Sequence, residues 1–124
     1  GTNSSLRSLR LSQEISRIPV INSFIGIQYD AATMRVSKLV ATFIPDRGLT
    51  RTPKLSAQQA EQSVSGEVTE PTHLGYYAKC CPPTAPKLVW VINVWTASRM
   101  GERFYVDAIS GVVLDRLPTS ANLN

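Results

Sequence analysis

The chain has 124 residues and a formal net charge of +4, with 43% hydrophobic and 18% charged residues. That length suits one domain or two very small ones, and the ordinary hydrophobic and charged fractions exclude a chain that is disordered overall. The basic residues are scattered and form no run, which argues against a nucleic-acid interface. No apolar run approaches the ~20 residues that a membrane-spanning helix needs.

Three strands are predicted in the first part of the chain, over residues 6–15, 20–29 and 35–44. Pro19 breaks the first from the second because proline has no backbone N–H to donate. Gly26 indicates a bulge or a close packing contact within the second strand. The side chains expected to face a core from the outer strands are those of Leu9, Leu11, Ile15, Val36, Leu39 and Phe43.

Residues 46–54 contain Gly48 and Pro53 and are predicted to connect two subdomains. A helix is expected next, because Ser56 and Gln59 fit a capping box, in which each side chain satisfies a backbone N–H of the first turn. Gly66 is the expected C-terminal cap of this helix. Its narrow apolar face, which we expect to pack on a sheet, consists of Ala57, Ala60 and Val64. Residues 68–71 and 74–79 are predicted to form one interrupted edge strand.

The last third of the chain is predicted to form three consecutive antiparallel strands over residues 88–96, 103–106 and 112–117. Residues 107–111 form the turn between the last two, with Gly111 at a position of positive φ. Trp95 has the opposite parity from Trp90 on the first of these strands, so we expect it to be partly exposed and to serve as a partner anchor. The expected core side chains are those of Trp90, Ile92, Val94, Phe104, Val106, Val113 and Leu117.

One short pattern occurs twice: YDAATMRV at residues 29–36 and VDAISGVV at residues 106–113. Both read as strand, Asp-Ala turn and strand. Because Met34 stands where the second copy has Gly111, the two turns need not share a conformation. We interpret the pattern as recurring hairpin chemistry and not as a duplicated domain.

The residues that carry most enzymatic chemistry are scarce. His73 is the single histidine, it is predicted in a loop, and there is no HExxH motif, so the sequence predicts no metal site and no cofactor. Cys80 and Cys81 are adjacent, which disfavours a disulfide between them; two free thiols or pairing with other cysteines remain open. A cysteine nucleophile with His73 as base lacks an orienting partner. We therefore predict a binding or scaffolding domain that is not an enzyme.

Residues 6–46 resemble the fungalysin/thermolysin propeptide motif, in which a strand ending in a Gln-rich segment leads to an Ile-Pro-Val turn and two further strands. The matching residues are Gln13, Ile18-Pro19-Val20, Asp30 and Phe43 to Pro45, whereas Arg17 stands where the family usually has Gly and Asn22-Ser23 where Phe-Gly is commoner. Residues 53–118 are similar to a PepSY domain. That likeness rests on the segment LSAQQAEQ and on Val106, Asp107, Ala108, Gly111 and Val113.

The resemblance implies an α+β fold of PepSY/cystatin-like type: an antiparallel curved sheet packed on one main helix, preceded by a three-strand N-terminal subdomain. It implies the non-catalytic pro-region of a secreted zinc metalloprotease, acting as intramolecular chaperone and inhibitor, with the catalytic domain as partner in cis or in trans. The flexible tail, residues 119–124, would lie along the protease cleft by main-chain hydrogen bonds. The expected partner-binding residues are Trp95, Thr119, Ser120, Ala121 and Asn122.

The chain begins Gly1-Thr2-Asn3, without an initiator methionine or a signal peptide. We expect a processed or subcloned piece of a secreted or periplasmic protein, from which the export signal has been removed. The alternative function is a stand-alone exported PepSY-type module that binds a protease or another protein in trans. An enzyme that uses Cys80 or Cys81 is a third reading.

Overall fold

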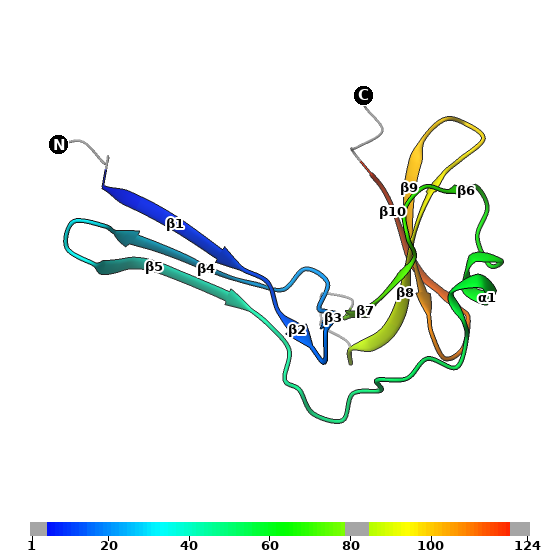
Figure 1. Ribbon diagram of the computed structural model, residues 1–124, viewed down its shortest axis with the longest axis horizontal. Coiled ribbons are helices and arrows are strands. Elements are labelled where there is room, and N and C mark those ends of the chain that lie inside the picture. Colours follow the sequence, from blue (N-terminus) through cyan, green and yellow to red (C-terminus); the bar gives the residue numbers. More distant parts are fainter. Residues whose placement is uncertain (1–4, 79–84, 120–124) are drawn as a thin grey trace. The chain divides into compact units, whose positions relative to one another are not determined.

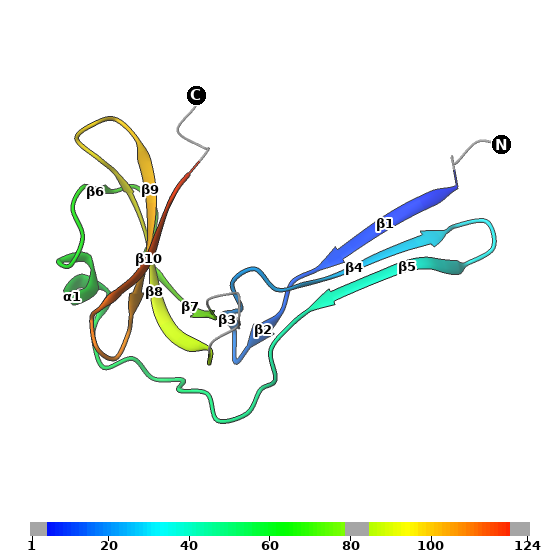
Figure 2. The same ribbon diagram turned by 180° about the vertical axis from the view of Figure 1, so that it is seen from behind.

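The computed structural model describes residues 5–78 and 85–119, and Figures 1 and 2 show it from opposite sides. Antiparallel strands take up 50% of these residues and one short helix 5%. The chain divides into two compact units, Gly1–Arg47 (unit 1) and Gly48–Asn124 (unit 2). The described residues include no helix that is long and apolar enough to cross a membrane.

Unit 1 is built on a three-stranded antiparallel sheet with the strand order β1-β4-β5. Its strands are β1 (Leu6–Leu11), β4 (Phe24–Asp30) and β5 (Arg35–Thr42), so the three predicted strands are present but shorter than expected. The first predicted strand divides after Leu11, and its end forms β2 (Glu14–Ile15), which pairs with β3 (Ile18–Pro19) in a separate hairpin.

The two-residue turn between β2 and β3 has a left-handed backbone. Ser16 and Arg17 both have positive φ, at 52° and 68°. Two-residue hairpin turns of this kind favour glycine, because a Cβ is strained in the left-handed region. Ser16 and Arg17 therefore both occupy left-handed positions that glycine would adopt with less strain.

The two Asp-Ala turns share one conformation. The fifth residue of each turn has positive φ, at 57° for Met34 and 83° for Gly111, and its N–H bonds the carbonyl oxygen of the opening aspartate, Asp30 or Asp107. In both turns the carboxylate of that aspartate accepts a bond of 2.8 Å from the N–H two residues later. The repeated pattern thus forms a turn with the same hydrogen bonds in both places. The positive φ strains the backbone at Met34, whereas glycine at position 111 adopts it without strain.

Exchanging these two turn residues should have opposite effects. Met34→Gly should stabilise unit 1 by about 0.5–1 kcal/mol, because Met34 is 74% exposed and only loses strain. Gly111→Met should destabilise unit 2 by roughly 1–3 kcal/mol, since a Cβ there lies 3.1 Å from Cδ1 of Leu55 at a positive φ. Hydrogen exchange of the amides of β4 and of β9 measures the two effects separately. A loss of stability in Met34→Gly would contradict the argument.

Unit 2 contains a five-stranded antiparallel sheet with the order β10-β9-β8-β6, in which β7 also pairs with β8. The long central strands are β8 (Lys87–Trp95) and β9 (Gly101–Asp107), and β10 (Val113–Pro118) forms one edge. The predicted interrupted edge strand is confirmed: β6 (Glu67–Val68) and β7 (His73–Tyr77) pair with successive parts of β8. His73, which was predicted in a loop, opens β7.

The expected α+β fold with one main helix is wrong. The helix α1 (Ala57–Glu61) has five residues and ends at the C-cap Gln62, so no main helix packs along the sheet. The predicted capping box is confirmed, because Ser56 and Gln59 each bond the other's backbone N–H. A capping box fixes where a helix begins, but two serines and a glycine follow Gln62 and do not sustain helical turns.

Gly66 is not the helix cap that its position suggested. Its φ is 119°, and a Cβ built on it would lie 3.0 Å from the carbonyl oxygen of Trp95 and from Cβ of Val94. The backbone at residue 66 therefore runs directly against β8, and only glycine allows that approach.

The core of unit 2 lies where the short helix meets β8 and β9. Ala60, Ile92, Val94, Phe104 and Val106 form this buried cluster, and Val64 and Trp90 pack against it. Trp90 donates its Nε1–H to the carbonyl oxygen of Leu55 at 2.9 Å. Val113 and Leu117 were expected in this core but are 38% and 40% exposed, because β10 is the edge strand.

Candidate interaction surfaces

One face of the unit 1 sheet is apolar and exposed. The strand register places Leu9, Ile27 and Leu39 side by side across β1, β4 and β5, and the next row holds Leu11, Ile25 and Ala41. Leu39 is 64% exposed, and Leu9, Leu11, Val36 and Phe43 are exposed too. The expectation that Val36, Leu39 and Phe43 face a core is therefore wrong, and of the predicted core residues of unit 1 Ile15 alone is fully buried.

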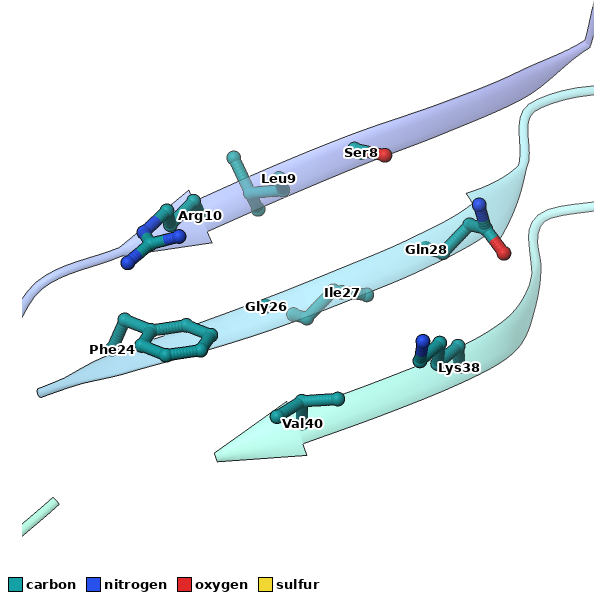
Figure 3. A pocket seen from close by; sticks show the side chains of 9 residues that line it. All are labelled: Ser8, Leu9, Arg10, Phe24, Gly26, Ile27, Gln28, Lys38 and Val40. Carbon is teal, nitrogen blue, oxygen red and sulfur yellow. The ribbon is translucent and has the colours of Figure 1, made fainter. Parts of the chain in front are cut away.

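The opposite face of the same sheet is more polar and carries a pocket of about 380 Å³ (Figure 3). The Arg10 guanidinium lies over the ring of Phe24, 4.0 Å from its centroid, which is a cation–π contact. A Cβ built on Gly26 would lie 3.4 Å from Cε2 of Phe24, which is an ordinary van der Waals distance, so the ring does not require glycine at this position. The predicted bulge at Gly26 is wrong, because the bulge falls between Gln28 and Tyr29.

Unit 1 also carries most of the chain's net charge. It has six basic and three acidic residues, which makes +3 of the total of +4. Two of these basic residues, Arg10 and Lys38, line the pocket on the face opposite Leu39.

A second pocket, of about 200 Å³, lies in unit 2 where β6 and β8 end and β9 begins. Gly101 of β9 forms the floor of this pocket. It pairs with Trp95 of β8 on one side, and on the other side its carbonyl oxygen accepts a hydrogen bond of 3.0 Å from the N–H of Thr119. Because glycine has no side chain, the side chains of Trp95 and Thr119 have a gap between them. Thr69, Glu70, Asn93 and Arg103 also line the pocket.

Arg103 is held in this pocket by a buried amide. Its Nε–H donates to Oδ1 of Asn93 at 2.8 Å, and Asn93 is 5% exposed. The carbonyl oxygen of Asn93 accepts bonds from Thr69 N–H at 2.9 Å and from its hydroxyl at 3.3 Å, which fixes the neighbouring chain. Within residues 5–78 and 85–119, no group takes a hydrogen bond from the terminal amino groups of Arg103.

The structure brings together two of the predicted partner-binding residues, Trp95 and Thr119, which lie on either side of Gly101. Trp95 is 36% exposed, in agreement with its parity on β8. Ser120, Ala121 and Asn122 lie outside the described residues. The sequence reasoning missed Arg103 and Asn93, although Asn93 shares the parity of Trp95 on β8 and so lies on the same face.

A tyrosine joins the two edges of the unit 2 sheet. Tyr77 of β7 stacks on Tyr105, with ring centroids 4.6 Å apart, and its hydroxyl donates to Oδ2 of Asp115 on β10 at 2.6 Å. Since β7 and β10 are at opposite ends of the strand order, the sheet must curl to allow this bond. Burial, the bond to Asp115 and the charge of Asp115 raise the pKa of Tyr77 to about 12.

Tyr77→Phe should lower the free energy of unfolding by roughly 1–2 kcal/mol at neutral pH, because Asp115 loses a partly buried donor. The raised pKa adds a pH dependence. The stabilisation by Tyr77 is full below the ordinary pKa of 10.0 and is lost as pH rises towards 12, since the unfolded chain ionises first. The gap between wild type and variant in urea unfolding should therefore narrow above pH 10. Tyr29→Phe is the control, and an equal loss in both variants would refute the bond's contribution.

The turn that begins at Asp107 stabilises the ionised form of the Asp107 carboxylate. Burial raises the pKa of Asp107, but the N–H groups of Ile109 and Ser110 and the charge of Lys87, 3.7 Å away, outweigh it and leave the pKa below 3.8. A lowered pKa contributes stability at neutral pH that is lost as pH falls through the folded-state value. This aspartate is accordingly explained as a turn residue.

The residues considered for catalysis are not assembled among the described ones. His73 is exposed on β7, with Nδ1 3.5 Å from the carbonyl oxygen of Pro71. Cys80 and Cys81 lie outside the described residues. In the described ranges no group of three or more His, Cys, Asp or Glu side chains is placed to hold a metal ion.

Comparison with known proteins identifies the fold. No protein-family model matches the chain, and no curated protein sequence matches it. Among solved structures, the Bacillus megaterium YpeB C-terminal domain is similar, with a TM-score of 0.61 and 12% sequence identity. The chain shares the fold of that domain. The match covers 97% of this chain and 54% of that one, so the chain spans about half the length of its structural neighbour.

Proposed function

We propose that this chain is a non-catalytic PepSY-type module that serves as the pro-region of a secreted or periplasmic zinc metalloprotease, assisting the folding of the catalytic domain and inhibiting it. The likeness to the YpeB domain, which is of PepSY type, supports the module. The resemblance of residues 6–46 to the propeptide motif supports the protease partner. The zinc in this proposal belongs to the partner's catalytic domain.

The observation that carries the proposal is the exposed apolar face of the unit 1 sheet. Leu9 and Leu11 on β1 and Leu39 on β5 lie on the same face, on either side of β4, and are exposed together. Burying each such side chain contributes about 1.5–3 kcal/mol. Several such side chains exposed on a single-layer sheet lower the stability of unit 1 alone, and their burial would contribute binding free energy to a complex. Both effects are expected of a chain that folds against a partner.

Charge substitutions on the two faces of β5 test this use of the sheet. Leu39→Lys should weaken inhibition of a thermolysin-like protease at least tenfold, because a lysine in a buried apolar contact is desolvated. Val40→Lys is the matched control: it adds the same charge at the next position of the same exposed strand, on the opposite face. Inhibition constants and yields of refolded protease are measured with each variant. Equal effects of the two substitutions would reject the apolar face as the binding surface.

A stand-alone module that binds a protein in trans is the second candidate. The structural neighbour supports it, because a C-terminal domain is a module of this fold that no catalytic domain follows. Reading the coding sequence downstream separates the candidates, since a pro-region must be followed by a catalytic domain with an HExxH motif.

The third hypothesis, an enzyme that uses Cys80 or Cys81, predicts that the cysteines are required for function. Alanine at both cysteines should leave protease binding intact if the chain acts through its folded surface. Loss of function on that substitution would favour the cysteine enzyme.

A further inference from the structure

We propose that the unit 2 pocket floored by Gly101 (the Trp95–Arg103 pocket) is a side-chain recognition site for a partner segment that carries a single carboxylate next to an apolar residue. This inference rests on the proposed protein-binding function and names a contact within it. The occupant would be a glutamate or aspartate side chain, with its apolar neighbour packed on Trp95.

The size of the pocket fits one side chain. Its volume of about 200 Å³ is below the range of roughly 300–1,000 Å³ that is typical of small-molecule sites. The gap over Gly101 lets an incoming group reach the backbone of the sheet, and Trp95, which is partly exposed beside it, offers an aromatic surface of the kind that dominates binding energy in interfaces.

The chemistry of Arg103 fits a carboxylate. Its Nε–H is already occupied by the buried Asn93, which fixes the guanidinium plane before binding. The terminal amino groups then form a preoriented donor pair of the type that binds carboxylates with two parallel hydrogen bonds. Preorganisation of this kind reduces the entropy lost when the ligand is ordered.

Glu70 limits the occupant to a single negative charge. It is exposed and lines the same pocket, so a second carboxylate on the ligand would be repelled. Recognition here is by side chains and not by addition of a strand, because Pro118 at the neighbouring end of β10 has no N–H to offer an incoming strand.

Capped peptides with free access to the pocket test the site directly. The probe is an N-acetylated, C-amidated tetrapeptide with leucine next to glutamate, and its partner has glutamine in place of glutamate. Binding is followed in the full chain by the NMR signal of the Trp95 indole N–H, which Trp95→Phe distinguishes from that of Trp90. The glutamate peptide should shift this signal saturably, and the glutamine peptide should bind at least tenfold more weakly.

Two charge variants should move the affinity in opposite directions. Arg103→Gln should weaken binding of the glutamate peptide at least tenfold, whereas Glu70→Gln should strengthen it about two- to fivefold by removing repulsion. Arg103→Lys keeps the positive charge but loses the two parallel donors of the guanidinium, so it should also weaken binding. An unchanged backbone amide spectrum shows that each variant is folded. Equal binding of both peptides, or unchanged affinity in Arg103→Gln, would overturn the proposal.

The outcome for this pocket is separable from that for the proposed function. If the chain inhibits a metalloprotease but the pocket takes no glutamate peptide, the pocket proposal alone fails. If the peptide binds as described but no metalloprotease is inhibited, the pocket stands and the protease partner is wrong.

Discussion

Gly66→Ala should destabilise unit 2 by roughly 2–6 kcal/mol, the largest effect expected of any single methyl group added to this chain. Two costs add at this position. A φ of 119° is a region that side-chain-bearing residues adopt only with strain, which costs on the order of 1–3 kcal/mol. The new Cβ would also meet the carbonyl oxygen of Trp95 and Cβ of Val94 at 3.0 Å, and relieving that overlap costs about 1–3 kcal/mol more.

Gly48→Ala is the matched control, because it introduces backbone strain at a positive φ without steric overlap of the new Cβ. Gly48 has a φ of 67°, but nothing lies within 4 Å of a Cβ built on it. Its substitution should therefore cost about 1–2 kcal/mol, the strain alone. Urea unfolding followed by tryptophan fluorescence measures both, since Trp90 and Trp95 belong to unit 2. Equal losses in the two variants would show that the approach of residue 66 to β8 is not tight.

Gly66→Ala should also disturb the Trp95–Arg103 pocket, because the overlap falls on the backbone of Trp95 itself. Weaker binding of the glutamate peptide in this variant would connect the close backbone approach with the shape of the pocket. A stability loss with unchanged peptide binding would confine the effect of Gly66 to packing.

The sequence specified strands and turns well because their signals are local. The apolar run of β8 predicted a central strand of unit 2, and the two Asp-Ala turns predicted one hairpin in each unit. The repeated turn has the same hydrogen bonds in both copies. The capping box located the start of α1 for the same reason. Each of these features is decided by residues within a few positions of one another.

What the sequence left open depends on contacts between distant residues. The length of the helix was overestimated because Val64 continues the apolar face of Ala57 and Ala60 and Gly66 was expected as the C-terminal cap. The helix instead ends at the C-cap Gln62, and Gly66 packs against β8. Alternating apolar residues such as Leu39 identify one face of a strand but not whether a second layer covers it. Arg103 joins Trp95 in one pocket only through the β8–β9 register, which a single sequence does not fix.

Gln13→Leu should destabilise unit 1 by roughly 2–4 kcal/mol, the second large effect we expect. The Gln13 side chain spans to the end of β5, where its Nε2 donates to the carbonyl oxygen of Ile44 at 2.7 Å and its Oε1 accepts from Ile44 N–H at 2.9 Å. One side-chain amide thus satisfies both backbone groups of a residue 31 positions away, at a partly buried place. Removing it leaves a donor and an acceptor unpaired, each at about 1–2 kcal/mol.

Two further variants make the Gln13 prediction specific. Gln13→Glu keeps the acceptor for Ile44 N–H but faces the Ile44 carbonyl with a carboxylate, so it should lose at least half as much stability as Gln13→Leu. Gln28→Leu makes the same change at a half-buried glutamine whose Oε1 accepts a bond from the Ser37 hydroxyl at 3.3 Å, and it should cost under about 0.5 kcal/mol. Hydrogen exchange of the β4 and β5 amides measures unit 1 alone. Gln13 is one of the residues on which the resemblance to the propeptide motif rests. If the amides of β4 and β5 exchange at the same rate in Gln13→Leu as in the wild type, the two bonds to Ile44 do not explain why a glutamine stands there.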